Sequence, residues 1–225
     1  MNVSIIIPTL DEAVILERTL SEVSGYFPHE LIVTDGGSRD ATLDIARRFT
    51  SRIVQSRPGR ALQMNAAARE ATGDLLLFLH ADSRIDGTSY AKMVEVMENV
   101  RLVGGAFSLA IESDDYFLQM ISALATLRAR YFHLVYGDQA IFVRKAIFND
   151  MGGFPSLPIC EDLEFYRQLK KTGPVILLNE KAYTSGRRWV TEGVFLTTAR
   201  NILIATLFLM GFPPRILSKW YVVIR

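Results

Sequence analysis

Short apolar runs alternate with segments of helical periodicity along the first part of the chain. Runs typical of strands occupy residues 3–7, 31–33, 52–54 and 75–79. Apolar side chains recur at helical spacing in the intervening residues 12–24, 40–49 and 61–71. This alternation predicts an α/β fold, with a mostly parallel sheet and helices on both faces.

The pattern changes after Asp86. It predicts a helix near residues 89–99, a strand over 103–111 and a long helix over 115–132. A helix that is apolar on most of its circumference follows near residues 194–210. A chain of 225 residues is long enough for one large α/β domain with a proper core. We therefore expect this domain over residues 1–190 and a helical extension over 191–225.

Three segments that end predicted strands supply carboxylates: residues 8–12, 35–42 and 80–83. Right-handed crossovers place these strand ends along one edge of the sheet, where open α/β sheets bind ligands. Asp82 closes the apolar run 75–79, and a divalent cation holding a diphosphate would explain a carboxylate there. A loop or helix-capping role for Asp82 is the structural alternative.

Asp35 stands at the start of the second of these segments. Gly36 and Gly37 permit a tight turn, and Ser38 or Asp40 can cap the helix that follows. With the turn and cap in place, we expect the Asp35 carboxylate to point out of the sheet. There it could accept a hydrogen bond from a uracil imide or from a ribose hydroxyl.

Composition excludes several classes of protein. The formal net charge of +1 gives no general attraction to nucleic acid. The chain has no G-x-G-x-x-G after its first strand, no P-loop and no G-x-S-x-G nucleophile elbow. Three histidines and one cysteine leave too few ligands for a zinc cluster. The lone Cys160 also excludes an internal disulfide framework and fits a reducing compartment, and we interpret it as a packing or incidental residue.

Taken together, these segments resemble the family 2 glycosyltransferases, which have the GT-A fold. Residues 8–12 (PTLDE) are similar to the family's P-x-x-N/D-E, residues 35–42 (DGGSRDAT) to its nucleotide-binding motif, and residues 59–65 (GRALQMN) to its G-x-x-x-x-x-N. Further along, residues 80–82 (HAD) are similar to D-x-D, residues 152–154 and 161–162 to G-G-F…E-D, and residues 188–189 to R-W. The likeness covers about residues 3–190, and six motifs in the same order make it specific.

The resemblance implies a transfer of sugar from a nucleoside diphosphate sugar, UDP- or GDP-linked, to an acceptor hydroxyl with inversion at the anomeric carbon. It implies the following roles: nucleoside contacts from Pro8, Thr9, Glu12 and Asp35; diphosphate contacts from Arg60, Arg188 and Trp189; a donor contact from His80 and Ala81; a Mg²⁺ or Mn²⁺ ligand in Asp82; and a general base in Asp162, beside Glu161.

Several of these assignments have structural alternatives. His80 stands where the family has the first Asp of D-x-D, so it could bind ribose, favour Mn²⁺ over Mg²⁺, or be a buried and satisfied histidine. Glu161 and Asp162 open a predicted helix, where acidic residues also act as simple caps. Residues 136–140 could hold the acceptor or form a plain turn. Arg187 and Arg188 could bind a diphosphate, or they could simply lie on the solvated surface.

The C-terminal part of the chain is basic. From Gly186 to Arg225 there are six Arg or Lys residues and one acid, Glu192. An apolar helix with basic flanks can be buried in the same domain, form a homodimer, or lie in a membrane interface. The longest uncharged run, residues 201–214, is shorter than a spanning helix needs, and the N-terminus reads as a strand. We expect a cytoplasmic protein, with the inner membrane face and a lipid-linked acceptor as the alternative location and substrate.

Two rival functions remain on the sequence alone. A nucleotidyltransferase shares a nucleotide site at the sheet edge but normally needs a Gly-rich basic loop, whereas residues 8–12 are acidic and lack glycine. A non-catalytic nucleotide-binding protein is kept open by His80 in place of the first Asp. A glycosyltransferase would release a nucleoside diphosphate, a nucleotidyltransferase would release pyrophosphate, and a binding protein would release neither.

Overall fold

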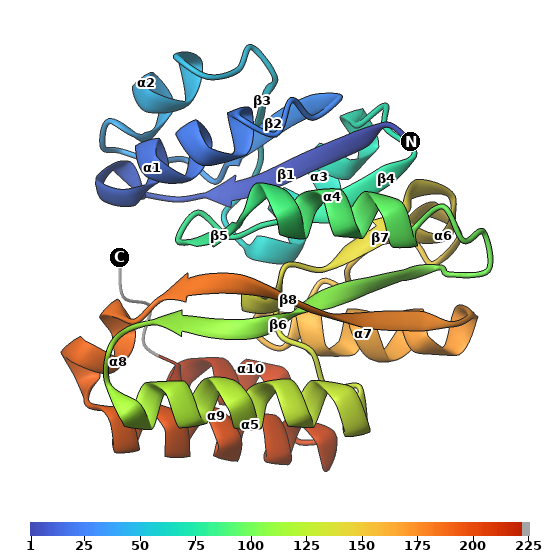
Figure 1. Ribbon diagram of the computed structural model, residues 1–225. Coiled ribbons are helices and arrows are strands. Elements are labelled where there is room, and N and C mark those ends of the chain that lie inside the picture. Colours follow the sequence, from blue (N-terminus) through green and yellow to red (C-terminus); the bar gives the residue numbers. More distant parts are fainter. Residues whose placement is uncertain (222–225) are drawn as a thin grey trace.

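Eight strands form one mixed sheet in the order β3-β2-β1-β4-β7-β6-β8-β5, with helices on both faces (Figure 1). The structure is a computed structural model that describes residues 1–221. Its strands are β1 (Val3–Thr9), β2 (Glu30–Asp35), β3 (Ile53–Gln55), β4 (Leu75–Phe78), β5 (Ser83–Ile85), β6 (Gly104–Glu112), β7 (Phe142–Arg144) and β8 (Val175–Ser185). Its α-helices are α1 (Ala13–Ser24), α2 (Thr42–Arg47), α3 (Arg60–Glu70), α4 (Gly87–Val96), α5 (Tyr116–Phe132), α6 (Lys145–Asp150), α7 (Glu161–Thr172), α8 (Arg187–Glu192), α9 (Val194–Leu209) and α10 (Pro214–Leu217). Two 3₁₀ turns, η1 (Gly137–Gln139) and η2 (Ser218–Trp220), complete the described elements.

The N-terminal half of the sheet is parallel, as the alternation of strands and helices predicts. β1 pairs in parallel with β2 and β4, and β2 pairs in parallel with β3. β7 then pairs antiparallel with both β4 and β6, and β8 joins β6 in parallel and β5 antiparallel. The expected α/β class and the helices on both faces are confirmed.

Alternation along β1 divides the core between the two faces of the sheet. Ile5 and Ile7 belong to one buried cluster with side chains of α1 and α4. Ile6 belongs to a second cluster with α3 and α7, where Phe154 and Phe165 stack with ring centroids 4.1 Å apart. Because successive side chains on a strand point to opposite faces, one apolar strand serves both clusters.

Strand β8 is the largest element that the periodicity does not predict. The exposed Asn179 and Lys181 interrupt its apolar residues. The pairing with β6 slips there, because Phe107 pairs with Leu178 while the next residue, Ser108, pairs with Lys181. A β-bulge of this kind removes the strict two-residue alternation, so the sequence pattern alone does not identify the strand.

The predicted boundary at residue 190 falls within α8. Beyond it, α9 and α10 pack below the sheet, and α9 lies beside α5 (Figure 1). Phe117 of α5 and Phe195 of α9 are in contact, with ring centroids 5.7 Å apart. Among the described residues, no helix is long and apolar enough to cross a bilayer. The last residues of the expected extension, 222–225, lie outside the described part, and Arg225 is among them.

Candidate functional site

A cavity of about 580 Å³ opens at the carboxyl ends of β1 and β4. Its wall is formed by the loop after β1, the start of α3, the β4–β5 loop, η1, the start of α7, and α8. Helix α9 and turn η2 close it on the remaining side. The cavity includes almost every residue selected from the sequence: Pro8, Thr9, Glu12, Arg60, His80, Ala81, Asp82, Glu161, Asp162, Arg188 and Trp189.

Asp35 is the exception, and the expectation that its carboxylate points out of the sheet is wrong. Its side chain is buried, at 1 % exposure, and it does not line the cavity. One oxygen, Oδ2, accepts from the backbone N–H groups of Gly37 and Ser38 at 2.8 and 3.0 Å, and Oδ1 accepts from the Ser38 hydroxyl at 2.5 Å. The same Gly-Gly-Ser turn that was expected to release the carboxylate therefore holds it, because the turn's N–H groups point back at it.

Asp40 accepts hydrogen bonds at the starts of two helices, although the N-cap residue of α2 is Ala41. Its carboxylate accepts from the backbone N–H and the hydroxyl of Thr42, the first residue of α2, and from the N–H of Ala13 at the start of α1. Ser38 accepts from the N–H of Asp11. These contacts join the loops after β1 and β2, and so they fix the first wall of the cavity.

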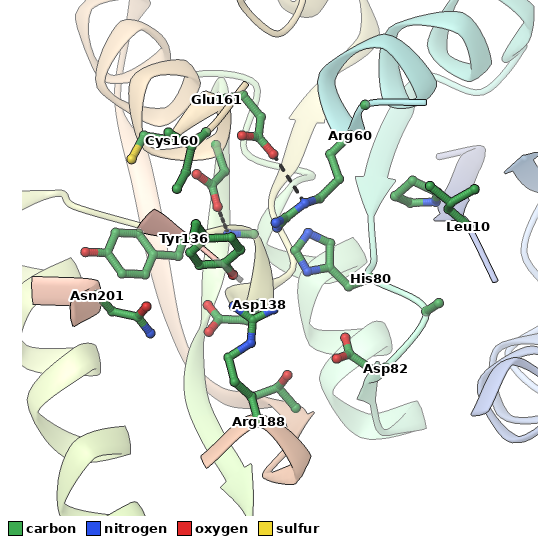
Figure 2. A pocket seen from close by; sticks show the side chains of 18 of the residues that line it. Leu10, Arg60, His80, Asp82, Tyr136, Asp138, Cys160, Glu161, Arg188 and Asn201 are labelled. Atoms are coloured by element: carbon green, nitrogen blue, oxygen red, sulfur yellow. Dashed lines mark hydrogen bonds and ion pairs between the residues drawn. The ribbon is translucent and has the colours of Figure 1, made fainter. Parts of the chain in front are cut away.

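Asp82 lies in the β4–β5 loop with its carboxylate facing the cavity (Figure 2). Its side chain is 28 % exposed, and Oδ2 lies 3.6 Å from Nη2 of Arg187. Arg187 also donates to Oε2 of Glu12 at 2.9 Å. The carboxylate is thus held in place by a charged neighbour while it remains open to the cavity.

Asp162, at the start of α7, is joined to η1 by a short hydrogen bond. The backbone N–H of Gly137 donates to its Oδ2 at 2.6 Å, and the N–H of Leu163 donates to its Oδ1 at 2.7 Å. Glu161 lies beside it with Oε1 3.6 Å from Nε of Arg60. Burial raises the pKa of Glu161, and the Arg60 charge opposes that shift. Both residues thus lie in the first turn of α7 and also line the cavity.

His80 packs against Gly137, the residue whose N–H donates to Asp162. Desolvation and the positive charge of Arg60 lower the pKa of His80, so its imidazole is neutral at pH 7. A Cβ atom at position 137 would lie 2.4 Å from Nε2 of His80 and 3.3 Å from Oδ2 of Asp162. Gly137 therefore needs to be glycine for space, because it lets two site residues approach the same backbone atom.

Gly137→Ala tests this close approach. The added methyl group displaces His80 and Asp162, and overpacking of this kind costs about 1–3 kcal/mol of stability. We expect turnover at this cavity to fall at least about tenfold, which is the effect of roughly 1.4 kcal/mol at the transition state. Gly87→Ala is the matched control, because a Cβ there meets only Tyr26 at 3.9 Å. Equal activity of both variants would show that the contact of Gly137 with His80 and Asp162 does not matter.

Three cavity residues carry buried polar atoms without a hydrogen-bond partner among the described residues: Asp138 Oδ1, Arg188 Nη1 and Asn201 Oδ1. Figure 2 shows Asn201 entering from α9, on the side away from His80 and Asp82. Burial raises the pKa of Asp138 to about 6. Buried polar atoms normally have partners, so these three mark positions where a bound molecule can complete the hydrogen bonds. The turn at residues 136–140 accordingly lines the cavity as well as reversing the chain.

Asn65 connects two of the sequence motifs, residues 59–65 and residues 152–154. Its amide donates to the carbonyl of Phe154 and accepts from the N–H of Phe154, both at 2.8 Å. Gly153 lies against it with φ near +80°, and a Cβ there would come within 2.5 Å of Asn65 Oδ1. Asn65 therefore holds the loop that leads into α7 and its acidic pair.

Sequence reasoning did not identify the contributions of Gln63, Asn201, Ile204 and Tyr221 to the cavity wall. The Gln63 side chain donates to the carbonyls of Thr9 and Thr34 and so ties the ends of β1 and β2 together. The residues of α9 and Tyr221 reach the cavity only through tertiary packing, for which the sequence has no local signal. Cys160, interpreted as a packing residue, packs beside Ile159 and also lines the cavity, and burial raises its thiol pKa to about 12.

The cavity can hold a divalent cation only if a bound molecule supplies some of the ligands. Residues 1–221 contain no group of three or more His, Cys, Asp or Glu side chains placed to hold a metal ion. Mg²⁺, however, is commonly bound by one or two carboxylates together with substrate phosphates and water. Asp82 can supply the protein ligand, and a diphosphate would have to supply others.

Comparison with known proteins identifies similar chains. The family model described as "Glycosyl transferase family 2" matches residues 4–133. The glycosyltransferase AglE of Haloferax volcanii is 28% identical over 174 residues, which are 68% of this chain and 56% of AglE. A PGL/p-HBAD biosynthesis glycosyltransferase of Mycobacterium tuberculosis is 42% identical over 93 residues, 36% of each chain. The matched part thus spans about half of the first relative and a third of the second.

Solved structures share the fold at low sequence identity. The mannosyltransferase PcManGT from Pyrobaculum calidifontis, in complex with GDP-Man and Mn²⁺, superposes with a TM-score of 0.69 over 98% of this chain and 69% of its own, at 18% identity. S. aureus TarS 1-349 in complex with UDP-GlcNAc gives a TM-score of 0.68 over 82% of this chain and 58% of that one, at 19% identity.

Proposed function

Because the chain belongs to glycosyl transferase family 2, we propose that it transfers a sugar from a nucleoside diphosphate sugar to an acceptor hydroxyl. The observation that carries this proposal is the meeting of Asp82 and Asp162 in one cavity at the carboxyl ends of β1 and β4. Asp82 comes from the β4–β5 loop and Asp162 from the start of α7, about eighty positions apart, and packing alone gives no reason to aim both at the same space.

The donor nucleotide is proposed to lie against the loop after β1. Pro8, Thr9 and Glu12 line this side of the cavity, while Asp35 holds the adjoining turn from beneath. Asp35 therefore acts in this proposal by shaping the nucleoside pocket, and a direct contact would require its turn to open. The complexes of PcManGT with GDP-Man and of TarS with UDP-GlcNAc support a nucleotide sugar as donor, UDP- or GDP-linked.

Asp82 is the proposed protein ligand of Mg²⁺ or Mn²⁺ on the donor diphosphate. When bound, the cation offsets negative charge that develops on the departing diphosphate. Arg187 lies beside Asp82, and Arg60 and Arg188 line the same cavity. Guanidinium groups suit phosphate oxygens because they are always charged and donate in pairs, and this chemistry supports a role for these side chains in binding the leaving diphosphate.

Asp162 is the proposed general base. Its Oδ2 would take the proton from the acceptor hydroxyl as the hydroxyl oxygen bonds to the anomeric carbon. The bond from that carbon to the diphosphate oxygen breaks at the same time, and the electron pair leaves with the diphosphate. Attack from the face opposite the leaving group inverts the anomeric centre. The hydrogen bond from Gly137 orients the carboxylate for this step.

An activity screen of the purified full chain tests the function. The chain is incubated with UDP- and GDP-sugars, with Mn²⁺ or with EDTA, and the released nucleotide is measured. We expect slow, cation-dependent release of nucleoside diphosphate from one donor. Release of pyrophosphate would identify a nucleotidyltransferase instead. Tight nucleotide binding without release of either product, in the presence of Mn²⁺ and of candidate acceptor alcohols, would identify a binding protein.

A further inference from the structure

The exposed apolar side chains of this protein are concentrated on one part of its surface. Of the 22 large hydrophobic residues that are exposed in the described structure, sixteen lie within residues 116–132 and 195–220. These residues belong to α5, α9, α10, η2 and the loop between α9 and α10, and we call their outer surface the apolar helical face. A concentration of exposed apolar side chains of this kind normally marks an interaction surface.

Helix α5 presents a regular stripe to solvent. Phe117, Met120, Leu124, Leu127 and Tyr131 are 43–70% exposed and recur at intervals of three or four residues. The other side of the helix is buried, with Leu118 and Ala125 packed on β6. An amphipathic helix normally turns such a stripe toward the core, so α5 has two apolar sides. The outer side is largely exposed in the described structure, although its Phe117 contacts Phe195 of α9.

Helix α9 separates the cavity from the apolar helical face. Ile204 and Ala205 are buried and line the cavity, whereas the preceding Ile202 and Leu203 are 62% and 50% exposed. A molecule held at the apolar helical face is therefore one helix away from the cavity. Figure 1 shows α5, α9 and α10 side by side below the sheet.

The charge of this segment selects among possible partners. Residues 193–221 contain Arg200, Arg215 and Lys219 and no acidic residue. Arg200 is paired with Glu192, but Arg215 and Lys219 are exposed, and the half-exposed Trp220 follows them. A symmetric dimer would bring two copies of this positively charged surface together. An anionic bilayer matches both the apolar residues and the positive charge.

We propose that the apolar helical face docks on an anionic lipid bilayer. The docking rests on the surface alone and does not depend on the proposed function. Helices α5 and α9 lie in the interface with their apolar side chains among the acyl chains. Arg215 and Lys219 contact lipid phosphates.

Vesicle flotation of the full chain tests the docking. We expect binding to vesicles of phosphatidylcholine with phosphatidylglycerol and at least about tenfold weaker binding to phosphatidylcholine alone, since each surface Lys or Arg adds to the attraction of anionic lipid. Leu124→Glu and Ile202→Glu should each reduce binding at least about tenfold, because each puts a charge into the acyl region. Val14→Glu is the matched control, because Val14 is 98% exposed on α1, away from the apolar helical face.

One further variant separates charge from apolar contact. Arg215→Glu should weaken the preference for phosphatidylglycerol and leave nucleotide release in solution unchanged. That readout keeps failure of the docking distinct from failure of the proposed function. Absence of flotation on both vesicles would overturn the proposal. So would a dimer in sedimentation that Leu124→Glu dissociates, because the face would then bind a second copy.

Discussion

Asp162→Asn is expected to slow sugar transfer by about 10²–10⁴-fold, which is the usual contribution of a positioned general base. The amide oxygen of Asn can still accept the hydrogen bond from the N–H of Gly137, but the amide cannot take a proton from the acceptor. Steady-state release of nucleoside diphosphate measures the effect. The affinity for the donor should change little, because the donor diphosphate is proposed to contact Asp82 and the arginines instead.

Glu164→Gln is the control for this variant. Glu164 lies on the same helix, α7, but outside the cavity, where it pairs with Arg167. The loss of a carboxylate from the surface of α7 should leave turnover near the wild-type value. If Asp162→Asn retains near-normal turnover while remaining folded, the base is another group.

Asp82→Asn is expected to remove the dependence of donor binding on the divalent cation. A metal that offsets leaving-group charge contributes several kcal/mol at the transition state, so transfer should fall by about 10²-fold or more. Arg187 keeps its hydrogen bond to Glu12 in the variant, so the loop should remain in place. Isothermal titration of UDP or GDP with and without Mn²⁺ measures the change.

The control for this experiment is Asp44→Asn. Asp44 is an exposed carboxylate on α2 that pairs with Arg47, and it lies outside the cavity. Mn²⁺ should tighten nucleotide binding to Asp44→Asn as it does to the wild type. A cation effect of equal size in Asp82→Asn would remove Asp82 as the metal ligand.

The parallel part of the fold and most of the site were predictable from the sequence because both depend on local patterns. Short apolar runs identified β1, β2 and β4, and the rule that ligands bind at the carboxyl ends of parallel strands placed Asp82 at the cavity. The acidic pair Glu161 and Asp162 lies at the start of α7, as the helical spacing after it indicates.

The remaining features depend on packing between distant segments. Strand β8 is interrupted by a bulge, and the contribution of Asn201 to the cavity depends on how α9 packs. The Asp35 carboxylate illustrates a different limit. The residues of its turn were identified correctly. The direction of the side chain, however, depends on which backbone N–H groups of the turn point toward the carboxylate.

The central claim is that Asp82 and the cavity around it hold a nucleoside diphosphate through a divalent cation. A crystal of the full chain grown with GDP or UDP and Mn²⁺, measured at a wavelength where manganese scatters anomalously, tests it most directly. The account predicts an anomalous peak for a manganese ion that is coordinated by a carboxylate oxygen of Asp82 and by diphosphate oxygens. Asp162 should face the part of the cavity where the acceptor would bind. A diphosphate bound in the cavity with the manganese elsewhere, or a nucleotide bound outside the cavity, would contradict it.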